Sequence, residues 1–218
     1  MLCVSNITKS YGNLSILKDI SVHVDDGEIV AVTGPSGAGK TTLLQIVGTL
    51  DHPDSGKVVY DGNDVFALKD KELSQFRNKS LGFVFQMHAL LPEFTLMENV
   101  LMPAWIGHAP AKTATERART LLEEVGLGHR MDHKPSQLSG GECQRGAVAR
   151  ALINDPKIIL ADEPTGNLDS GNSVELSNLF FKMRELHGTT FVIVTHDNML
   201  AERCDRVLHI SDGKIINS

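Results

Sequence analysis

The sequence predicts an α/β protein in which a core built on a parallel sheet carries an antiparallel β part and an inserted lobe of helices. Short apolar–polar alternation over residues 16–24 is typical of antiparallel strands with one exposed face. Continuous apolar runs such as 28–33 are typical of strands buried in a parallel sheet. After residue 86 the strand patterns stop for more than fifty residues, which favours a lobe of helices.

The N-terminal half alternates strands and turns. The first 25 residues are expected to form antiparallel strands. Residues 28–33 then form a buried strand that leads into a glycine-rich loop and a helix continuing over 42–47. Residues 51–68 contain the pair Asp61-Gly62 between short apolar runs, a pattern that predicts a β-hairpin.

The second half begins with a strand over 82–85, followed by the helical lobe. Within that lobe, residues 111–125 form an amphipathic helix with an apolar face. The α/β pattern returns with strands at 157–162 and 190–194, a helix over roughly 172–187 between them, and a hairpin around 211–213. We therefore expect one domain over 1–218, with a core from 1–86 and 141–218 and an inserted helical subdomain over 87–140.

Length and composition limit the classes of function. The 218 residues suffice for one sizeable core, and the net charge of −6 argues against a broad basic surface for nucleic acid. No apolar run approaches the roughly 20 residues that span a bilayer, and the N-terminus does not resemble a signal peptide. Three scattered cysteines form neither a disulfide framework nor a CxxC metal site. We expect a protein that is soluble when isolated and contacts membranes only through partners.

The glycine-rich loop carries the strongest motif. Residues 34–41 match the pattern G-x-x-x-x-G-K-[ST], in which backbone N–H groups and a helix N-terminus hold phosphate oxygens. Lys40 is expected to reach the β- and γ-phosphates, and the Thr41 hydroxyl to bind Mg²⁺. A plain glycine-rich turn is the alternative, but the full match between a predicted strand and helix favours nucleotide binding. The predicted nucleotide-binding residues are Gly34, Pro35, Ser36, Gly37, Ala38, Gly39, Lys40, Thr41 and Thr42.

Two adjacent carboxylates end the strand predicted at 157–162. Asp162 is placed to hold Mg²⁺ or its water shell. Glu163 points elsewhere and is suited to polarise the water that attacks the γ-phosphate. In isolation the pair could equally be a surface feature before Pro164; together with the phosphate-binding loop, a catalytic role is the better interpretation.

Further motifs follow the same order and spacing as in a known family. They are Tyr11 within 9–12, Gln86 after a strand, Leu-Ser-Gly-Gly-Glu at 138–142 followed by Gln144-Arg145, Asn-Leu-Asp at 167–169, and His196 in Val-Thr-His-Asp. With the two motifs above, they resemble the ATP-binding cassette (ABC) ATPases over essentially the whole chain. The resemblance implies a P-loop NTPase (RecA-like) core, ATP and Mg²⁺ as cofactors, and Mg-dependent ATP hydrolysis.

The resemblance also implies a role for each motif. Tyr11 would stack on adenine, and Gln86 would contact Mg²⁺ or the attacking water. His196 would bind the γ-phosphate and orient Glu163. Ser139, Gly140 and Gly141 would face the γ-phosphate of a second subunit, with Asp169 at the dimer seam. Each residue alone has an ordinary alternative: a core tyrosine, a polar residue at a strand end, a helix N-cap or a structural histidine.

Within the family, residues 85–103 and 162–169 most resemble the lipoprotein-releasing (Lol) type, near macrolide exporters and cell-division relatives. This implies an ATP-bound homodimer at the cytoplasmic face of the inner membrane, driving permease subunits of the LolC/LolE kind. A macrolide exporter and a non-transport regulator of cell division or cell-wall enzymes remain alternatives. A chromosome-type or translation-type ATPase is less consistent, because the chain has no long coiled coil and only one cassette. The apolar residues of 87–103 are either core or a groove for the membrane partner.

Overall fold

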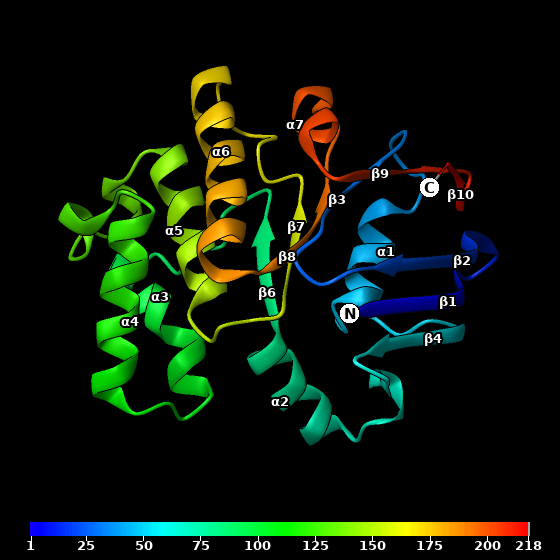
Figure 1. Ribbon diagram of the computed structural model, residues 1–218, viewed down its shortest axis with the longest axis horizontal. Helices are drawn as coiled ribbons and strands as arrows, with labels where there is room; N and C mark the ends of the chain where they lie inside the picture. The colour runs from blue at the N-terminus through cyan, green and yellow to red at the C-terminus, as the bar shows by residue number, and fades with distance from the viewer. Residues whose placement is uncertain (218) are drawn as a thin grey trace. The chain divides into compact units, whose positions relative to one another are not determined.

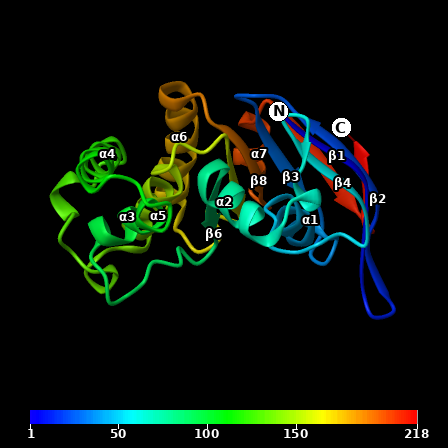
Figure 2. The same cartoon turned by 90° about the horizontal axis from the view of Figure 1, so that it is seen from below.

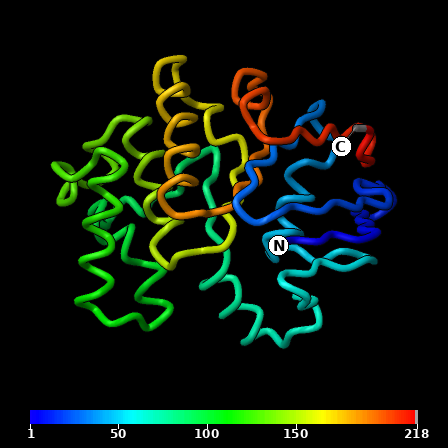
Figure 3. Tube along the Cα trace, in the orientation of Figure 1, coloured from blue at the N-terminus to red at the C-terminus, as the bar shows by residue number. Residues whose placement is uncertain are grey.

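The computed structural model describes residues 1–217, which fall into two compact units. Unit 1 comprises Met1–Arg77 and the segment from Thr190 onward, and unit 2 comprises Asn78–Thr189. In Figure 3 both ends of the chain, blue and red, belong to unit 1. The helical subdomain predicted over 87–140 lies inside unit 2, which also includes two strands and two further long helices. The predicted boundaries between core and inserted subdomain remain a prediction.

Unit 1 contains most of the strands. Its strands are β1 Leu2–Tyr11, β2 Leu14–Val24, β3 Ile29–Thr33, β4 Ser55–Tyr60, β5 Asn63–Asp64, β8 Thr190–Val194, β9 Arg206–Ser211 and β10 Lys214–Asn217. Its helices are α1 Lys40–Val47, the short 3₁₀ turn η1 Val65–Ala67 and α7 Asn198–Arg203, while α2 Asp70–Ser80 crosses the boundary between the units. The helix predicted from residue 42 thus begins two residues earlier.

The antiparallel part of unit 1 confirms the N-terminal prediction. Strands β2, β1, β4 and β5 form a sheet in that order, with β1 antiparallel to both β2 and β4. Alternate residues such as Leu2 and Val4 are buried, because one face of the sheet packs inward. The predicted hairpin within 51–68 forms from β4 and β5 around Asp61 and Gly62.

The parallel part of unit 1 is built on β3, which pairs in parallel with β8 on one side and β9 on the other. Ile29–Val32 of β3 and all of β8 are buried, as expected for strands covered on both faces. Helix α1 contacts both β8 and β2, and Figure 2 shows it between β3 and the antiparallel strands. The C-terminal hairpin predicted around 211–213 forms from β9 and β10.

Unit 2 combines two parallel strands with four long helices. Its elements are β6 Leu81–Phe85, α3 Leu96–Ile106, α4 Ala111–Glu124, η2 Gly128–Arg130, η3 Pro135–Gln137, α5 Gly140–Leu152, β7 Ile158–Asp162 and α6 Ser170–His187. Figure 1 shows α3, α4 and α5 packed together, and contacts join α5 to α6 and to β6. Residues 87–140 contain helices and turns without a strand, as predicted.

The core of unit 2 depends on a close approach between α3 and α5. Gly146 lies within α5, where a glycine normally costs stability relative to alanine. A Cβ atom built there would lie 2.5 Å from Leu96 Cδ1 of α3. The glycine therefore permits tight helix packing against Leu96, which is fully buried.

None of the helices in residues 1–217 has both the length and the apolar character required to cross a bilayer. Helix α6 is the longest at 18 residues, and it carries charged side chains such as Glu175, Lys182 and Arg184.

Candidate nucleotide-binding site

The glycine-rich loop of unit 1 follows β3 directly. Gly34 has a φ of +143°, and a Cβ atom at this position would lie 2.0 Å from the backbone oxygen of Ile210. Only glycine can turn the chain here, because any other side chain would clash with the neighbouring strand β9. The close approach turns the chain out of the sheet and into the loop that precedes α1.

Helix α1 begins at Lys40 with an open N-terminus. Its N-cap, Gly39, supplies no side-chain hydrogen bond, and the first turn carries no acidic residue. The first N–H groups of a helix have no partner inside the helix, and its N-terminus carries partial positive charge. The Lys40 amine adds a full charge and is held over the loop by the carbonyl oxygens of Gly34 at 2.8 Å and Pro35 at 3.0 Å.

A hollow of about 190 Å³, open to solvent, lies at this helix end. Its lining residues are Ile16, Gly37, Gly39, Lys40, Thr41 and Thr42. The hollow joins backbone N–H groups, a hydroxyl and an ammonium group, which is the donor set that a phosphate chain requires. The predicted phosphate loop therefore fits an anionic nucleotide.

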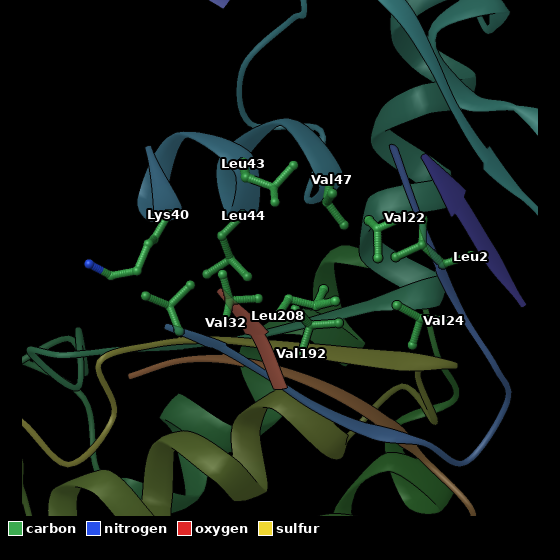
Figure 4. Close-up of a pocket in the computed structure, with 11 residues that line it drawn as sticks. Leu2, Val22, Val24, Val32, Lys40, Leu43, Leu44, Val47, Val192 and Leu208 are labelled. Carbon is green, nitrogen blue, oxygen red and sulfur yellow. The ribbon is translucent and has the colours of Figure 1, made fainter. Parts of the chain in front are cut away.

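A second cavity in unit 1 lies behind α1 and is apolar. Figure 4 shows it between α1 and the strands, with Leu43, Leu44 and Val32 among its lining residues. The stem of Lys40 also borders it, while the amine points away from the apolar side chains. A cavity of this lining cannot hold phosphate, so it belongs to the packing that fixes α1 on the sheet.

Tyr11, the predicted adenine contact, lies at the end of β1 and is 50% exposed. Its hydroxyl donates to Asp51 Oδ2 at 2.6 Å, and this hydrogen bond raises the pKa of Tyr11. The Lys9 ammonium lies 5.0 Å from the ring centroid and is itself bound to Asp51 at 2.9 Å. These contacts hold an exposed aromatic ring in place; its stacking on adenine remains a prediction.

His196 lies at the same sheet edge as the phosphate loop. Val32 of β3 pairs with Val194 of the parallel strand β8, so the loop after β3 and the residues after β8 leave the sheet side by side. Parallel strands in α/β proteins commonly present ligand-binding residues at their carboxyl ends. Within unit 1, the structure therefore brings His196 to the edge from which the phosphate loop begins.

The carboxyl ends of β6 and β7 carry the predicted catalytic residues of unit 2. Phe85 pairs with Asp162 in the parallel ladder, so the residues that follow each strand, Gln86 and Glu163, leave it side by side. The Gln86 side-chain amide donates to Asn167 Oδ1 at 3.3 Å, and Asn167 Nδ2 donates back to the Gln86 carbonyl at 3.3 Å. Gln86, Asp162 and Glu163 thus lie together at the carboxyl ends of β6 and β7, and their roles remain predictions.

Glu163 adopts a left-handed backbone conformation with a φ of +47°. Such a conformation is uncommon for residues other than glycine and is disfavoured by steric contacts of the Cβ atom. The turn that follows is closed by a hydrogen bond from the Gly166 N–H to the Glu163 carbonyl at 3.0 Å. This turn places the carboxylate in a direction that the strand itself would not give it.

The beginnings of α5 and α6 bring the remaining predicted residues of unit 2 together. Ser139 is the N-cap of α5, and Asp169 is the N-cap of α6. A Cβ atom on Gly141 would lie 2.2 Å from Asn172 Oδ1, and Asn172 in turn donates to Asp169 at 2.5 Å. The hydrogen bonds from Asn172 lower the pKa of Asp169.

Helix α5 has a complete capping box. The Ser139 hydroxyl accepts from the Glu142 N–H at 3.2 Å, and the Glu142 carboxylate accepts from the Ser139 N–H at 2.7 Å. The Glu142 carboxylate also accepts from Arg130 Nε at 3.1 Å. The hydrogen bond from Ser139 and the charge of Arg130 lower the pKa of Glu142. The ordinary N-cap alternative is therefore realised, and contact with a second subunit remains a prediction.

Sequence reasoning missed several residues that support the predicted ones. Asp51 binds both Tyr11 and Lys9. Asn167 binds Gln86, and Gln144 of α5 binds backbone carbonyls at the ends of β6 and β7. The printed sequence contains no signal for Asp51. The signal for Gln144 is its position just after the Leu-Ser-Gly-Gly-Glu motif, and the signal for Asn167 is its position in the Asn-Leu-Asp motif.

The fold and the phosphate-binding loop define a P-loop nucleotide-binding protein. A sequence profile described as "ABC transporter" matches residues 17–166. The chain therefore belongs to the ABC transporter family, whose ATP-binding proteins are ATPases.

Individual relatives indicate which members of the family the chain resembles. The chain is 58% identical to the "Lipoprotein-releasing system ATP-binding protein LolD" of Bacteroides fragilis, over 99% of this chain and 100% of that protein. It is 54% identical to the protein of the same name from Porphyromonas gingivalis, over 97% of both chains.

Solved structures share the fold over nearly the full length. The ATP-binding cassette MJ0796, in a dimeric post-hydrolysis state bound to ADP and Pi, superimposes with a TM-score of 0.90 at 40% identity, covering 100% of this chain and 97% of that one. The protein cbiO1 from Clostridium perfringens gives a TM-score of 0.91 at 29% identity, covering 99% of this chain and 86% of that one. The predicted fold class is confirmed.

Proposed function

We propose that this chain is the ATP-hydrolysing subunit of a lipoprotein-releasing ABC transporter, working as a dimer closed around ATP. The observation that carries the proposal is the 58% identity to a LolD protein over essentially the full length of both chains. The open N-terminus of α1 and the carboxylates at the end of β7 supply the chemistry.

The phosphate loop binds the nucleotide in this proposal. Backbone N–H groups at the start of α1 bind phosphate oxygens, and the Lys40 amine exchanges the loop carbonyls for the β- and γ-phosphates. Tyr11 holds the adenine ring by stacking. Binding therefore depends mainly on residues of unit 1.

Bound Mg²⁺ would neutralise the charge that builds up between the β- and γ-phosphates. The residues present fit this ion, because a hydroxyl, an amide oxygen and a carboxylate are the hard oxygen donors that Mg²⁺ prefers. We assign these ligands to Thr41, Gln86 and Asp162.

Hydrolysis requires a base, and Glu163 has this role. Its carboxylate accepts a proton from the attacking water, and the left-handed turn at this residue fixes the direction of the carboxylate. His196 donates a hydrogen bond to the γ-phosphate and orients Glu163. The hydroxyl and first N–H groups at Ser139, Gly140 and Gly141 of a second copy complete the site, with Asp169 at the seam between the copies.

Transport would follow from closure of this dimer on permease subunits of the LolC/LolE kind at the cytoplasmic face of the inner membrane. The name that the relatives share supports lipoproteins as cargo. The chain itself would then remain peripheral and contact the membrane through those permeases.

The test is to trap the Glu163→Gln variant with ATP in membranes of the native host and to identify the proteins that copurify. Loss of the general base should lower turnover by about 100-fold or more while leaving ATP binding intact. We expect two permease subunits and a bound lipoprotein. Glu123→Gln, on the exposed face of α4, is the matched control and should keep full turnover.

Two results would contradict the proposal. Unchanged hydrolysis by Glu163→Gln would remove the assigned base. Copurification of a division or cell-wall protein without permeases or lipoprotein would replace the transport function with a regulatory one.

A further inference from the structure

Gln144, in the second turn of α5, is buried in unit 2, and only the nitrogen of its side-chain amide has hydrogen-bond partners there. Its side chain is 2% exposed. The side-chain nitrogen donates to backbone carbonyls, whereas Oε1 is buried and has no hydrogen-bond partner among residues 1–217. A buried acceptor without a partner costs stability, so a glutamine that serves stability alone is a poor choice here.

The orientation of the amide follows from its neighbours. Nε2 lies 2.9 Å from the Phe85 carbonyl oxygen and 2.7 Å from the Pro164 carbonyl oxygen, with the Gln86 carbonyl oxygen further away at 3.4 Å. Carbonyl oxygens only accept hydrogen bonds, so the NH₂ group must face them and Oε1 must face away. The two short bonds use both amide hydrogens.

These carbonyls belong to the backbone on either side of the proposed catalytic residues. Phe85 is the last residue of β6 and precedes Gln86, and Pro164 follows Glu163 directly. Beyond β6 and β7 the ladder no longer joins the two chain segments, because its last pair is Phe85 and Asp162. The single amide of Gln144 joins the two segments where the ladder ends.

A second side chain of α5 binds the same segment further along. Arg150 donates to the carbonyl oxygens of Ala89 at 2.6 Å and His88 at 2.9 Å. Ala89 has a φ of +51°, an uncommon conformation that such bonds help to maintain. Helix α5 therefore holds this segment at two points, one at the end of β6 beside Gln86 and one two to three residues after Gln86.

We propose that Gln144 is a positioning residue for ATP hydrolysis, which fixes Gln86 and Glu163 relative to each other by binding the backbone carbonyls of Phe85 and Pro164. The inference rests on the proposed function, because it assumes that Glu163 is the base. Next to the Leu-Ser-Gly-Gly-Glu motif at 138–142, which would serve a second subunit, it places a residue that acts inside its own subunit. Gln144 itself does not touch the nucleotide in this proposal.

The test replaces the donor while keeping the length and volume of the side chain. In Gln144→Met the two carbonyls lose their donor, and the residues beside them can shift. We expect kcat to fall by about 10- to 100-fold, as for small displacements of catalytic groups, with KM and Kd for ATP changed less than about threefold.

Asn99→Leu is the matched control for loss of a buried amide. Asn99 is 1% exposed in α3 of the same unit, and its Nδ2 also donates to backbone carbonyls, those of Leu91, Phe94 and Thr95. We expect this variant to lower the melting temperature at least as much as Gln144→Met, while its kcat below the melting temperature stays within about threefold of wild type.

The outcomes separate this inference from the proposed function. If Glu163→Gln keeps its turnover, the proposed function fails and takes the inference with it. If Glu163→Gln loses turnover but Gln144→Met keeps kcat within about twofold, only the inference fails. A parallel loss of kcat in Gln144→Met and Asn99→Leu would also overturn it.

Discussion

The N-termini of α1 and α5 differ in how their first N–H groups are satisfied. Both helices begin at glycine-rich segments to which we assign a role at ATP. At α1 the N-cap is Gly39, without a side-chain hydrogen bond or an acidic residue in the first turn. At α5 a full capping box joins Ser139 and Glu142, and Arg130 binds the same carboxylate.

The difference indicates that the two helix ends have different tasks. The open end of α1 leaves backbone donors and a lysine that suit an anion, so we infer that it binds phosphate before any partner arrives. At α5 the capping box already binds two of the free N–H groups, so this helix end is stable without a ligand. We propose that it contacts a nucleotide only when a second copy brings one to it.

The largest expected effect comes from removing the charge at α1. Lys40→Met should weaken ATP binding by about 10- to 100-fold, the value of one charge-assisted hydrogen bond of about 1.5–3 kcal/mol. Equilibrium titration with a fluorescent ATP analogue measures this change. Lys57→Met, on the exposed part of β4, is the control. Equal affinities for the two variants would show that the α1 end is not the binding site.

A smaller effect is expected at the cap of α5. Ser139→Ala should lower the free energy of unfolding by about 1 kcal/mol, measured by urea denaturation. Thr95→Ala is its counterpart, because Thr95 and Glu98 form the same capping box on α3. Both variants should lose similar stability, but only Ser139→Ala should also lower ATPase activity. Equal activities would reduce Ser139 to an ordinary N-cap.

The smallest effect concerns the carboxylate of the α5 cap. The folded state lowers the pKa of Glu142, so its contribution to stability is present above the unfolded pKa and is lost as pH falls through the folded pKa. Glu142→Gln should therefore be less stable than wild type by about 0.5 kcal/mol at neutral pH. The difference should close below about pH 4. A difference in unfolding free energy that does not change with pH would contradict this interpretation.

Much of the fold and the phosphate loop could be predicted from the sequence. Continuous apolar runs gave β3 and β8 to within a residue, and the turn at Asp61 and Gly62 identified the hairpin. The phosphate loop was recognisable because its donors lie in one short segment. Local signals of this kind depend only on neighbouring residues.

Features that depend on distant packing could not be predicted. Helix α2 buries a single residue, Leu73, so it has no apolar periodicity, and α7 has only six residues. A glycine inside α5 normally costs stability, and only the close approach of Leu96 of α3 explains Gly146. The contacts of Gln144 with the backbone at the ends of β6 and β7 could not be predicted, because these segments are distant from it in the sequence.

Mixing two inactive variants tests the proposal that the α5 end completes the ATP site of a second copy. Lys40→Met keeps an intact α5 end, and Ser139→Arg keeps an intact phosphate loop. A mixed dimer contains one complete site only if Ser139 acts on the other copy. We expect the mixture to regain ATPase activity that neither variant has alone. A mixture that stays inactive, although exchange with labelled wild-type subunits shows that mixed dimers form, would contradict it.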